Sequence, residues 1–167
     1  MKLSTDSQRF LALLNAVSVR YLLTGGHAVV YHGCRRDVND LDVWVPRERE
    51  VAEKLVQVLR THGVNDQTLT PQMILAHDLV RIGRRPFAVR QEGDVLTIGA
   101  SPFRTELLFW TSGGAFEDCY QRRVRAAIDG LDVNVIGLED LIITKTASKR
   151  TVDREDLKRL SELQEEK

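Results

Sequence analysis

The sequence predicts an α/β (α+β) fold in which a mixed β-sheet is flanked by helices. Helical and strand-like patterns alternate up to about residue 63, strand-like segments follow one another as far as residue 110, and helical patterns dominate from about residue 138. One layer of strands covered by helices accounts for this order. The length of 167 residues suits one core, and no linker or repeat interrupts the chain. We therefore expect a single domain over residues 1–167, with a helical C-terminal segment from about residue 138.

The first third of the chain predicts helices around short strands. An apolar run leads into the glycine pair at positions 25 and 26, which is typical of a buried strand that ends at a helix start. Gly33 is suited to end that helix, and Pro46 suits the first turn of the next one. The expected elements are a helix from near Ser4 or Asp6 through Val17, a strand over 21–24, a helix over 26–32, a strand over 41–45, and a helix ending near Gly63.

The remainder of the chain predicts strands first and helices last. Residues 64–78 show no clear periodicity. Beyond them, β-branched and aromatic residues gather in short runs separated by glycine-containing turns, which is typical of strands. The expected elements are strands over 79–82, 87–90, 95–98 and 106–110, a helix over 115–127, a strand over 133–136, and two closing helices.

Composition and charge exclude several classes of protein. Hydrophobic residues make up 43% of the chain and charged residues 29%, with 24 basic and 24 acidic side chains. The formal net charge of zero excludes a global basic field of the kind that attracts nucleic acid. Two cysteines without metal-ligand spacing are typical of a reducing compartment, and no apolar run is long enough to span a bilayer. We expect a cytoplasmic protein that does not contact a membrane.

A glycine pair and two aspartates are the most informative residues for function. Adjacent glycines at a helix start, Gly25 and Gly26, leave backbone N–H groups free to meet an anion. Asp40 and Asp42 share one side of the next strand because side chains alternate with period two, and such like charges repel unless a divalent cation lies between them. Taken alone, the glycines also suit a plain turn, and the aspartates suit the exposed face of an edge strand. Together they predict a phosphate site beside a divalent metal.

The glycine pair followed by Asp-x-Asp on the next strand resembles the nucleotidyltransferase superfamily, whose fold is shared with DNA polymerase beta. The likeness extends to both ends of the chain, and the ordered set of motifs resembles the small stand-alone bacterial members. It implies a nucleotidyltransferase-like fold. The segments that carry the resemblance are residues 25–28, His32 with Gly33, Arg36, residues 40–42, 98–108 and 138–145, together with Arg150, Asp153 and Asp156.

The resemblance implies a metal-dependent enzyme. Two Mg²⁺ ions held by Asp40, Asp42 and Glu106 would stabilise the attacking and the departing oxygen at one phosphorus. Magnesium prefers carboxylate oxygens supplemented by water and substrate phosphate. The family most often has aspartate as its third carboxylate, so Glu106 departs from the pattern. Glu106 also stands in a strand rich in apolar residues, where a buried carboxylate needs a partner.

The resemblance also implies which residues bind the nucleoside triphosphate. The Gly25–Gly26 pair would let the backbone approach the β- and γ-phosphates, and Arg36 or Lys145 would neutralise them. Lys145 continues the apolar stripe of its helix, so an alternative is that it extends to solvent at the helix end. Capping of the last helix is the role expected for Asp153 and Asp156.

The implied activity is metal-dependent transfer of a nucleoside monophosphate from a nucleoside triphosphate to a hydroxyl acceptor. The acceptor is RNA, a protein, or a small molecule such as an aminoglycoside. The alternative is a catalytically degenerate nucleotidyltransferase-fold binding module, such as a toxin–antitoxin component with a partner protein, for which Glu106 in place of aspartate is the best support. A third, weaker alternative is a metal-dependent phosphohydrolase that uses the same carboxylates on water. The oligomeric state is left open.

Overall fold

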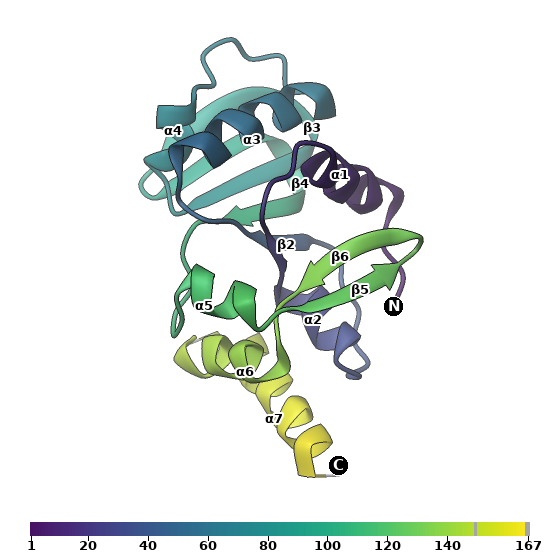
Figure 1. Cartoon of the computed structure of the whole chain (residues 1–167). Helices are drawn as coiled ribbons and strands as arrows, with labels where there is room; N and C mark the ends of the chain where they lie inside the picture. Colours follow the sequence, from purple (N-terminus) through teal and green to yellow (C-terminus); the bar gives the residue numbers. More distant parts are fainter. Residues whose placement is uncertain (149, 166–167) are drawn as a thin grey trace.

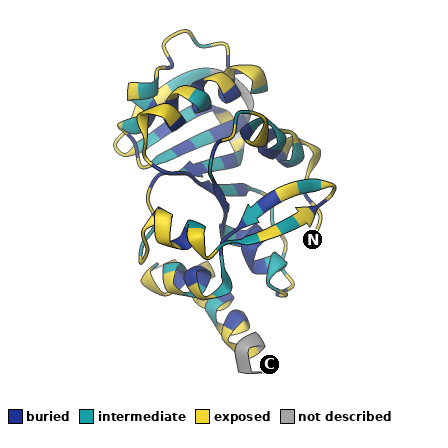
Figure 2. Cartoon of the chain, viewed as in Figure 1, coloured by how far each residue is buried: buried dark blue, intermediate teal, exposed yellow. Residues whose placement is uncertain are grey.

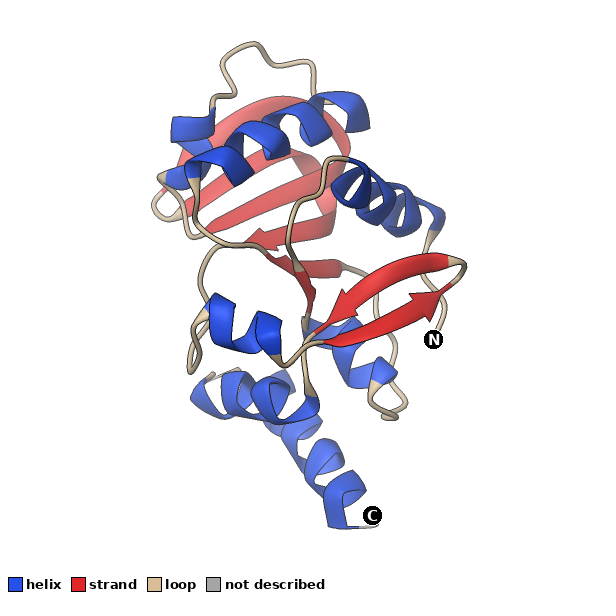
Figure 3. Ribbon diagram, viewed as in Figure 1, coloured by secondary structure: helices blue, strands red, loops and turns tan. Residues whose placement is uncertain are grey.

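The computed structural model describes residues 1–148 and 150–165, with side chains described except at 84–87, 101, 103 and 163–165. Helices cover a single mixed sheet, as the sequence predicts (Figure 1, Figure 3). The elements in chain order are α1 (Thr5–Ala16), β1 (Leu22–Leu23), α2 (Gly25–Tyr31), β2 (Leu41–Trp44), α3 (Arg49–His62), α4 (Pro71–Leu75), β3 (Leu79–Glu92), β4 (Val95–Leu108), α5 (Phe116–Gln121), β5 (Val124–Ile128), β6 (Leu131–Val135), α6 (Leu138–Ala147) and α7 (Thr151–Glu165).

The sheet has six strands in the order β3-β4-β2-β1-β6-β5. Strand β2 is antiparallel to its neighbour β1 and parallel to its neighbour β4. Strand β1 is parallel to its other neighbour, β6. The short central strands β1 and β2 are therefore held between two longer pairs. This order places β2 directly beside β4, which decides the geometry of the site described below.

The two longest strands bend and pair with each other more than once. Residues 79–82 pair with 95–98 in the same direction, and with 105–108 in the opposite direction. Residues 89–92 pair with 95–98 in the opposite direction, as the two arms of a hairpin do. The segments predicted as four strands therefore belong to two bent strands, except that the strand predicted over 106–110 ends at Leu108. A Cβ on Gly83, at the bend in β3, would lie 2.2 Å from the carbonyl oxygen of Ala100, so the close approach of the two backbones requires glycine there.

Two helix predictions differ from the structure. The helix predicted over 115–127 ends at Gln121, and Val124–Ile128 forms β5, a hairpin partner of β6. Asp129 and Gly130 have φ of 51° and 81°, as a two-residue hairpin turn of the primed type requires. The third helix begins at Arg49 and not at Pro46, because Glu48 is still extended at φ −128°.

The core lies between the sheet and the helices that cover it, where the buried residues gather (Figure 2). Helix α1 packs against α3 and β6, and α2 packs against β2 and α6. Both cysteines, Cys34 and Cys119, are free and buried. Within the described residues, no helix is both long enough and apolar enough to cross a membrane.

Candidate active site

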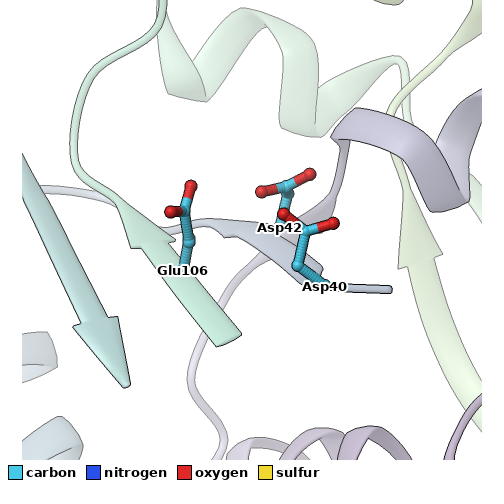
Figure 4. Close-up of side chains that lie close together, drawn as sticks. All are labelled: Asp40, Asp42 and Glu106. Atoms are coloured by element: carbon cyan, nitrogen blue, oxygen red, sulfur yellow. The ribbon is translucent and has the colours of Figure 1, made fainter. Parts of the chain in front are cut away.

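Three carboxylates meet at the junction of β2 and β4. Asp42 and Glu106 are partners in the β2–β4 register, and Asp40 directly precedes β2. Side chains at paired positions of neighbouring strands share one face of the sheet. One carboxylate oxygen from each residue lies within 4.8 Å of the others, and all three residues are half-buried (Figure 4). Within the described part of the chain, this is the only group of potential ligands close enough to hold a metal ion.

The cluster is electrostatically unfavourable without a cation. Burial raises the pKa of Asp42, and the neighbouring charges of Asp40 and Glu106 add to this, so that the pKa reaches about 7. The Arg150 charge and a hydrogen bond from the backbone N–H of Gly26 offset only part of the effect. A divalent ion between the carboxylates would remove the repulsion, and oxygen ligands of this kind suit Mg²⁺. The donor set therefore fits the predicted metal.

The glycine pair lies against Asp42. Strand β1 leads into Thr24, whose backbone N–H donates to the carbonyl of Asp42 at 3.0 Å, and helix α2 begins at the next residue. Gly25 has a φ of +58°, and a Cβ there would lie 1.8 Å from Asp42 Oδ2. The first glycine thus makes room for a carboxylate of the cluster. The predicted contact of both glycines with phosphate stays a prediction.

We expect Gly25→Ala to weaken Mg²⁺ binding at least about tenfold, because the new methyl group must displace the Asp42 carboxylate. The positive φ adds a loss of about 1–2 kcal/mol in the free energy of unfolding. Calorimetric Mg²⁺ titration and urea denaturation measure the two effects. Gly93→Ala is the matched control, since Gly93 has a φ of +57° and no atom within 4 Å of its added Cβ. Equal Mg²⁺ affinity in the two variants would contradict the role assigned to Gly25.

The two predicted phosphate-binding cations lie in a largely buried network of ion pairs. Lys145 Nζ donates to Asp153 Oδ1 at 2.6 Å and to Asp156 Oδ2 at 2.7 Å. Arg36 Nη1 donates to the same Asp156 oxygen at 2.6 Å. The network joins the segment before β2 to α6 and α7. Lys145 also lines the cleft over the carboxylates, and its ammonium has a third N–H, so its predicted role at phosphate remains a prediction.

Asp153 and Asp156 serve this network and not the capping role expected of them. Burial alone would raise the pKa of Asp153, but hydrogen bonds from Lys145, Ser148 and Arg150 outweigh burial and lower the pKa to about 2. Both carboxylates are almost wholly shielded from solvent. They act as fixed counter-charges for Lys145.

Sequence reasoning missed Arg81. Its Nε donates to Glu106 Oε1 at 2.9 Å, and the two residues are register partners in the antiparallel part of the β3–β4 pairing. A carboxylate has a second oxygen, so Glu106 can bind both Arg81 and a metal. The available signal was a charged residue of opposite sign in each of two otherwise apolar segments, residues 79–82 and 106–110.

An open cleft of about 260 Å³ lies over the cluster. Its walls come from the β1–α2 junction, β2, β3, β4, the segment after β4, α6 and the start of α7. Small-molecule sites commonly have about 300–1,000 Å³. A ligand of nucleotide size would therefore extend past the rim.

Comparison with known proteins agrees with this geometry. A family model described as aminoglycoside-2''-adenylyltransferase matches residues 8–160. A search of curated protein sequences found no match. The crystal structure of the lincosamide antibiotic adenylyltransferase LnuA with lincomycin bound is similar, with a TM-score of 0.56, 15% identity, and coverage of 97% of this chain and 98% of that chain.

Two further solved structures are similar. An antigenic nucleotidyltransferase-like protein from Paracoccidioides brasiliensis has a TM-score of 0.50 and 17% identity, covering 98% of this chain and 79% of that chain. The crystal structure of ANT(2")-Ia in complex with adenylyl-2"-tobramycin has a TM-score of 0.49 and 16% identity, covering 95% of this chain and 89% of that chain. The likeness to LnuA shows the nucleotidyltransferase-like fold that the sequence predicts. Because the family model spans nearly the whole chain, the chain belongs to the aminoglycoside-2''-adenylyltransferase family of nucleotidyltransferases.

Proposed function

We propose that the chain transfers AMP from ATP to a hydroxyl group of a small molecule, with Mg²⁺ held by Asp40, Asp42 and Glu106. The observation that carries the proposal is the meeting of these three carboxylates, two from the β2 segment and one from β4, beside Gly25. Membership of an adenylyltransferase family supports ATP as the donor and a small molecule as the acceptor. The comparisons lend no support to the toxin–antitoxin alternative.

The residues present suit an in-line displacement. The acceptor oxygen forms a bond to the α-phosphorus, the bond from that phosphorus to pyrophosphate breaks, and the hydroxyl proton is lost. Bound Mg²⁺ would neutralise charge on the attacking and leaving oxygens. The chain's own contribution is positioning: Gly25 admits Asp42 to the cluster, and Arg81 holds one oxygen of Glu106. Glu106 is the carboxylate we assign to receive the hydroxyl proton.

We expect Mg²⁺ with ATP to raise the melting temperature by about 5–10 °C when ATP is at about 100 times its dissociation constant. Asp40→Asn should abolish this shift, because it removes one of the metal ligands. Asp37→Asn is the control, since Asp37 is exposed in the same segment and lies outside the cluster. Differential scanning fluorimetry with and without EDTA measures the shift. No shift with ATP or any other nucleoside triphosphate would favour the binding-module alternative, and steady ATP hydrolysis without an acceptor would favour the phosphohydrolase.

A further inference from the structure

We infer that the acceptor is a hydroxylated ring compound of low positive charge that packs on Trp110, and that it is not a polycation. The inference rests on the proposed function and narrows its acceptor. The family description names aminoglycosides, which carry several ammonium groups, so the inference separates this chain from that substrate class.

The side of the cleft that receives the acceptor follows from the geometry of the displacement. The attacking and leaving oxygens lie on opposite sides of the reacting phosphorus. Gly25, Lys145 and Arg150 line the cleft from the β1–α2 junction, α6 and the start of α7, and these residues suit the triphosphate and the pyrophosphate that leaves. We assign the acceptor to the rest of the lining, which comes from β3, the end of β4 and the segment that follows β4, a segment that packs against α6 at Gly113.

Charge in the cleft disfavours a polycation. Three carboxylates line the cleft, and each one already belongs to the proposed metal site or accepts hydrogen bonds from neighbouring side chains. Asp42 belongs to the metal cluster, and Glu106 belongs to the cluster and also accepts from Arg81. Asp153 accepts from Lys145, Ser148 and Arg150. Among the described lining residues, no carboxylate is left to pair with an ammonium group of the acceptor.

The acceptor wall carries one guanidinium, that of Arg81, which is paired with Glu106. The Arg81 side chain is 41% exposed and lines the cleft beside Glu106. A second cation placed against it would lose hydration and meet a like charge, which disfavours binding. An uncharged hydroxyl group meets no such penalty, and it can accept a hydrogen bond from the guanidinium.

An aromatic side chain stands at the rim of the same wall. Trp110 follows β4, is 61% exposed and lines the cleft, whereas Trp44 is buried against Phe116. Leu79 and Leu108 continue the apolar surface inward from it. An exposed indole above an apolar wall is suited to the face of a sugar or other ring. The neighbouring hydroxyl groups of Thr111 and Ser112 also line the cleft and can bind polar substituents.

The test compares two acceptors on the full chain with Mg²⁺ and ATP. Lincomycin has a hydroxylated sugar ring and a single basic amine, whereas tobramycin is a polycation at neutral pH. We expect pyrophosphate release with lincomycin at a kcat/KM at least about 100-fold above that with tobramycin. A preference for tobramycin would overturn the inference and leave the proposed function standing. Failure of both to react or to bind, in a protein that shows the Mg²⁺–ATP shift, would also overturn it. A different result, no rise in melting temperature with Mg²⁺ and ATP, would contradict the proposed function itself.

Substitution of Trp110 tests the packing surface by itself. We expect Trp110→Ala to raise the KM for lincomycin about tenfold while kcat changes little and the Mg²⁺–ATP shift is kept. Trp110→Phe should restore most of the KM, because it keeps an aromatic face. An unchanged KM in Trp110→Ala, or a fall in kcat alone, would show that Trp110 does not hold the acceptor.

Discussion

Asp42→Asn is expected to abolish nucleotidyl transfer and, in the absence of metal, to stabilise the protein. Asp42 is the central member of the carboxylate cluster, paired in register with Glu106 and close to Asp40. Removing its charge removes a proposed metal ligand, so we expect kcat to fall at least about 10³-fold, or about 4 kcal/mol in the activation barrier. Pyrophosphate release measures this effect. A variant that kept more than a tenth of the wild-type rate would exclude the proposed metal site.

The stability effect of Asp42→Asn has a definite sign and pH range. The pKa of Asp42 is raised to about 7 from an unfolded value of 3.8, so the folded protein holds this proton more tightly. The wild type therefore loses stability as pH rises from about 4 to about 7. At pH 8 in EDTA, we expect the free energy of unfolding of the asparagine variant to be about 1–2 kcal/mol higher than that of the wild type. Near pH 4, the two free energies should be equal. Mg²⁺ should raise the wild-type melting temperature and leave the variant unchanged. A variant less stable than the wild type in EDTA at pH 8 would contradict this account.

Lys145→Met is expected to destabilise the protein by about 3–5 kcal/mol. Its ammonium is buried between Asp153 and Asp156, each about 1% exposed, and removing it leaves two carboxylates without their main counter-charge. Urea denaturation at pH 7 measures the loss. Lys145→Met combined with Asp153→Asn and Asp156→Asn is the control, because it removes the buried charges together. That triple variant should recover most of the stability, and equal stability of the single variant and the wild type would contradict the network.

The ion pairs between Lys145 and its two aspartates should also make the stability of the protein depend on pH in the acid range. The pKa of Asp153 is lowered to about 2 in the folded protein, so its contribution to stability is present above about pH 4 and is lost as pH falls towards 2. The difference between the wild type and Lys145→Met should therefore shrink over this range. A nucleotide role for Lys145 is tested in the same preparations. If the triple variant is folded but shows no Mg²⁺–ATP shift, the lysine contributes to nucleotide binding as well as to stability.

The meeting of the three carboxylates was implied by the resemblance to the nucleotidyltransferase superfamily, but each acid was predictable as a candidate because it carries a local signal. Asp40 and Asp42 show their shared face through a spacing of two, and Glu106 stands out as an acid in an apolar strand. The strand segments of β3 and β4 were predictable for the same reason. Their pairing was not, because it depends on a bend that brings Gly83 against Ala100. The Asp129–Gly130 turn was a readable signal for a hairpin, and overlooking it extended α5 into β5.

The hydrogen-bond partners of the site residues could not be predicted from local sequence patterns. Arg81 meets Glu106 only because β3 folds back along β4, a contact across 25 residues of chain. Lys145 meets Asp153 and Asp156 only because α6 and α7 turn against each other. Helical spacing places Lys145 on an apolar stripe but does not show what lies opposite. Side-chain roles that depend on tertiary pairing therefore required the structure.

The bond between Arg36 and Asp156 ties the segment carrying Asp40 to the last helix, and a second contact runs from Arg159 to the carbonyl of Arg35. All three acids of the cluster precede α7 in the order of synthesis. A nascent chain that has emerged only as far as α6 would carry all three proposed metal ligands, yet Lys145 and Arg36 would lack the carboxylates of Asp153 and Asp156. Catalytic competence should thus arise only after α7 has left the ribosome and docked.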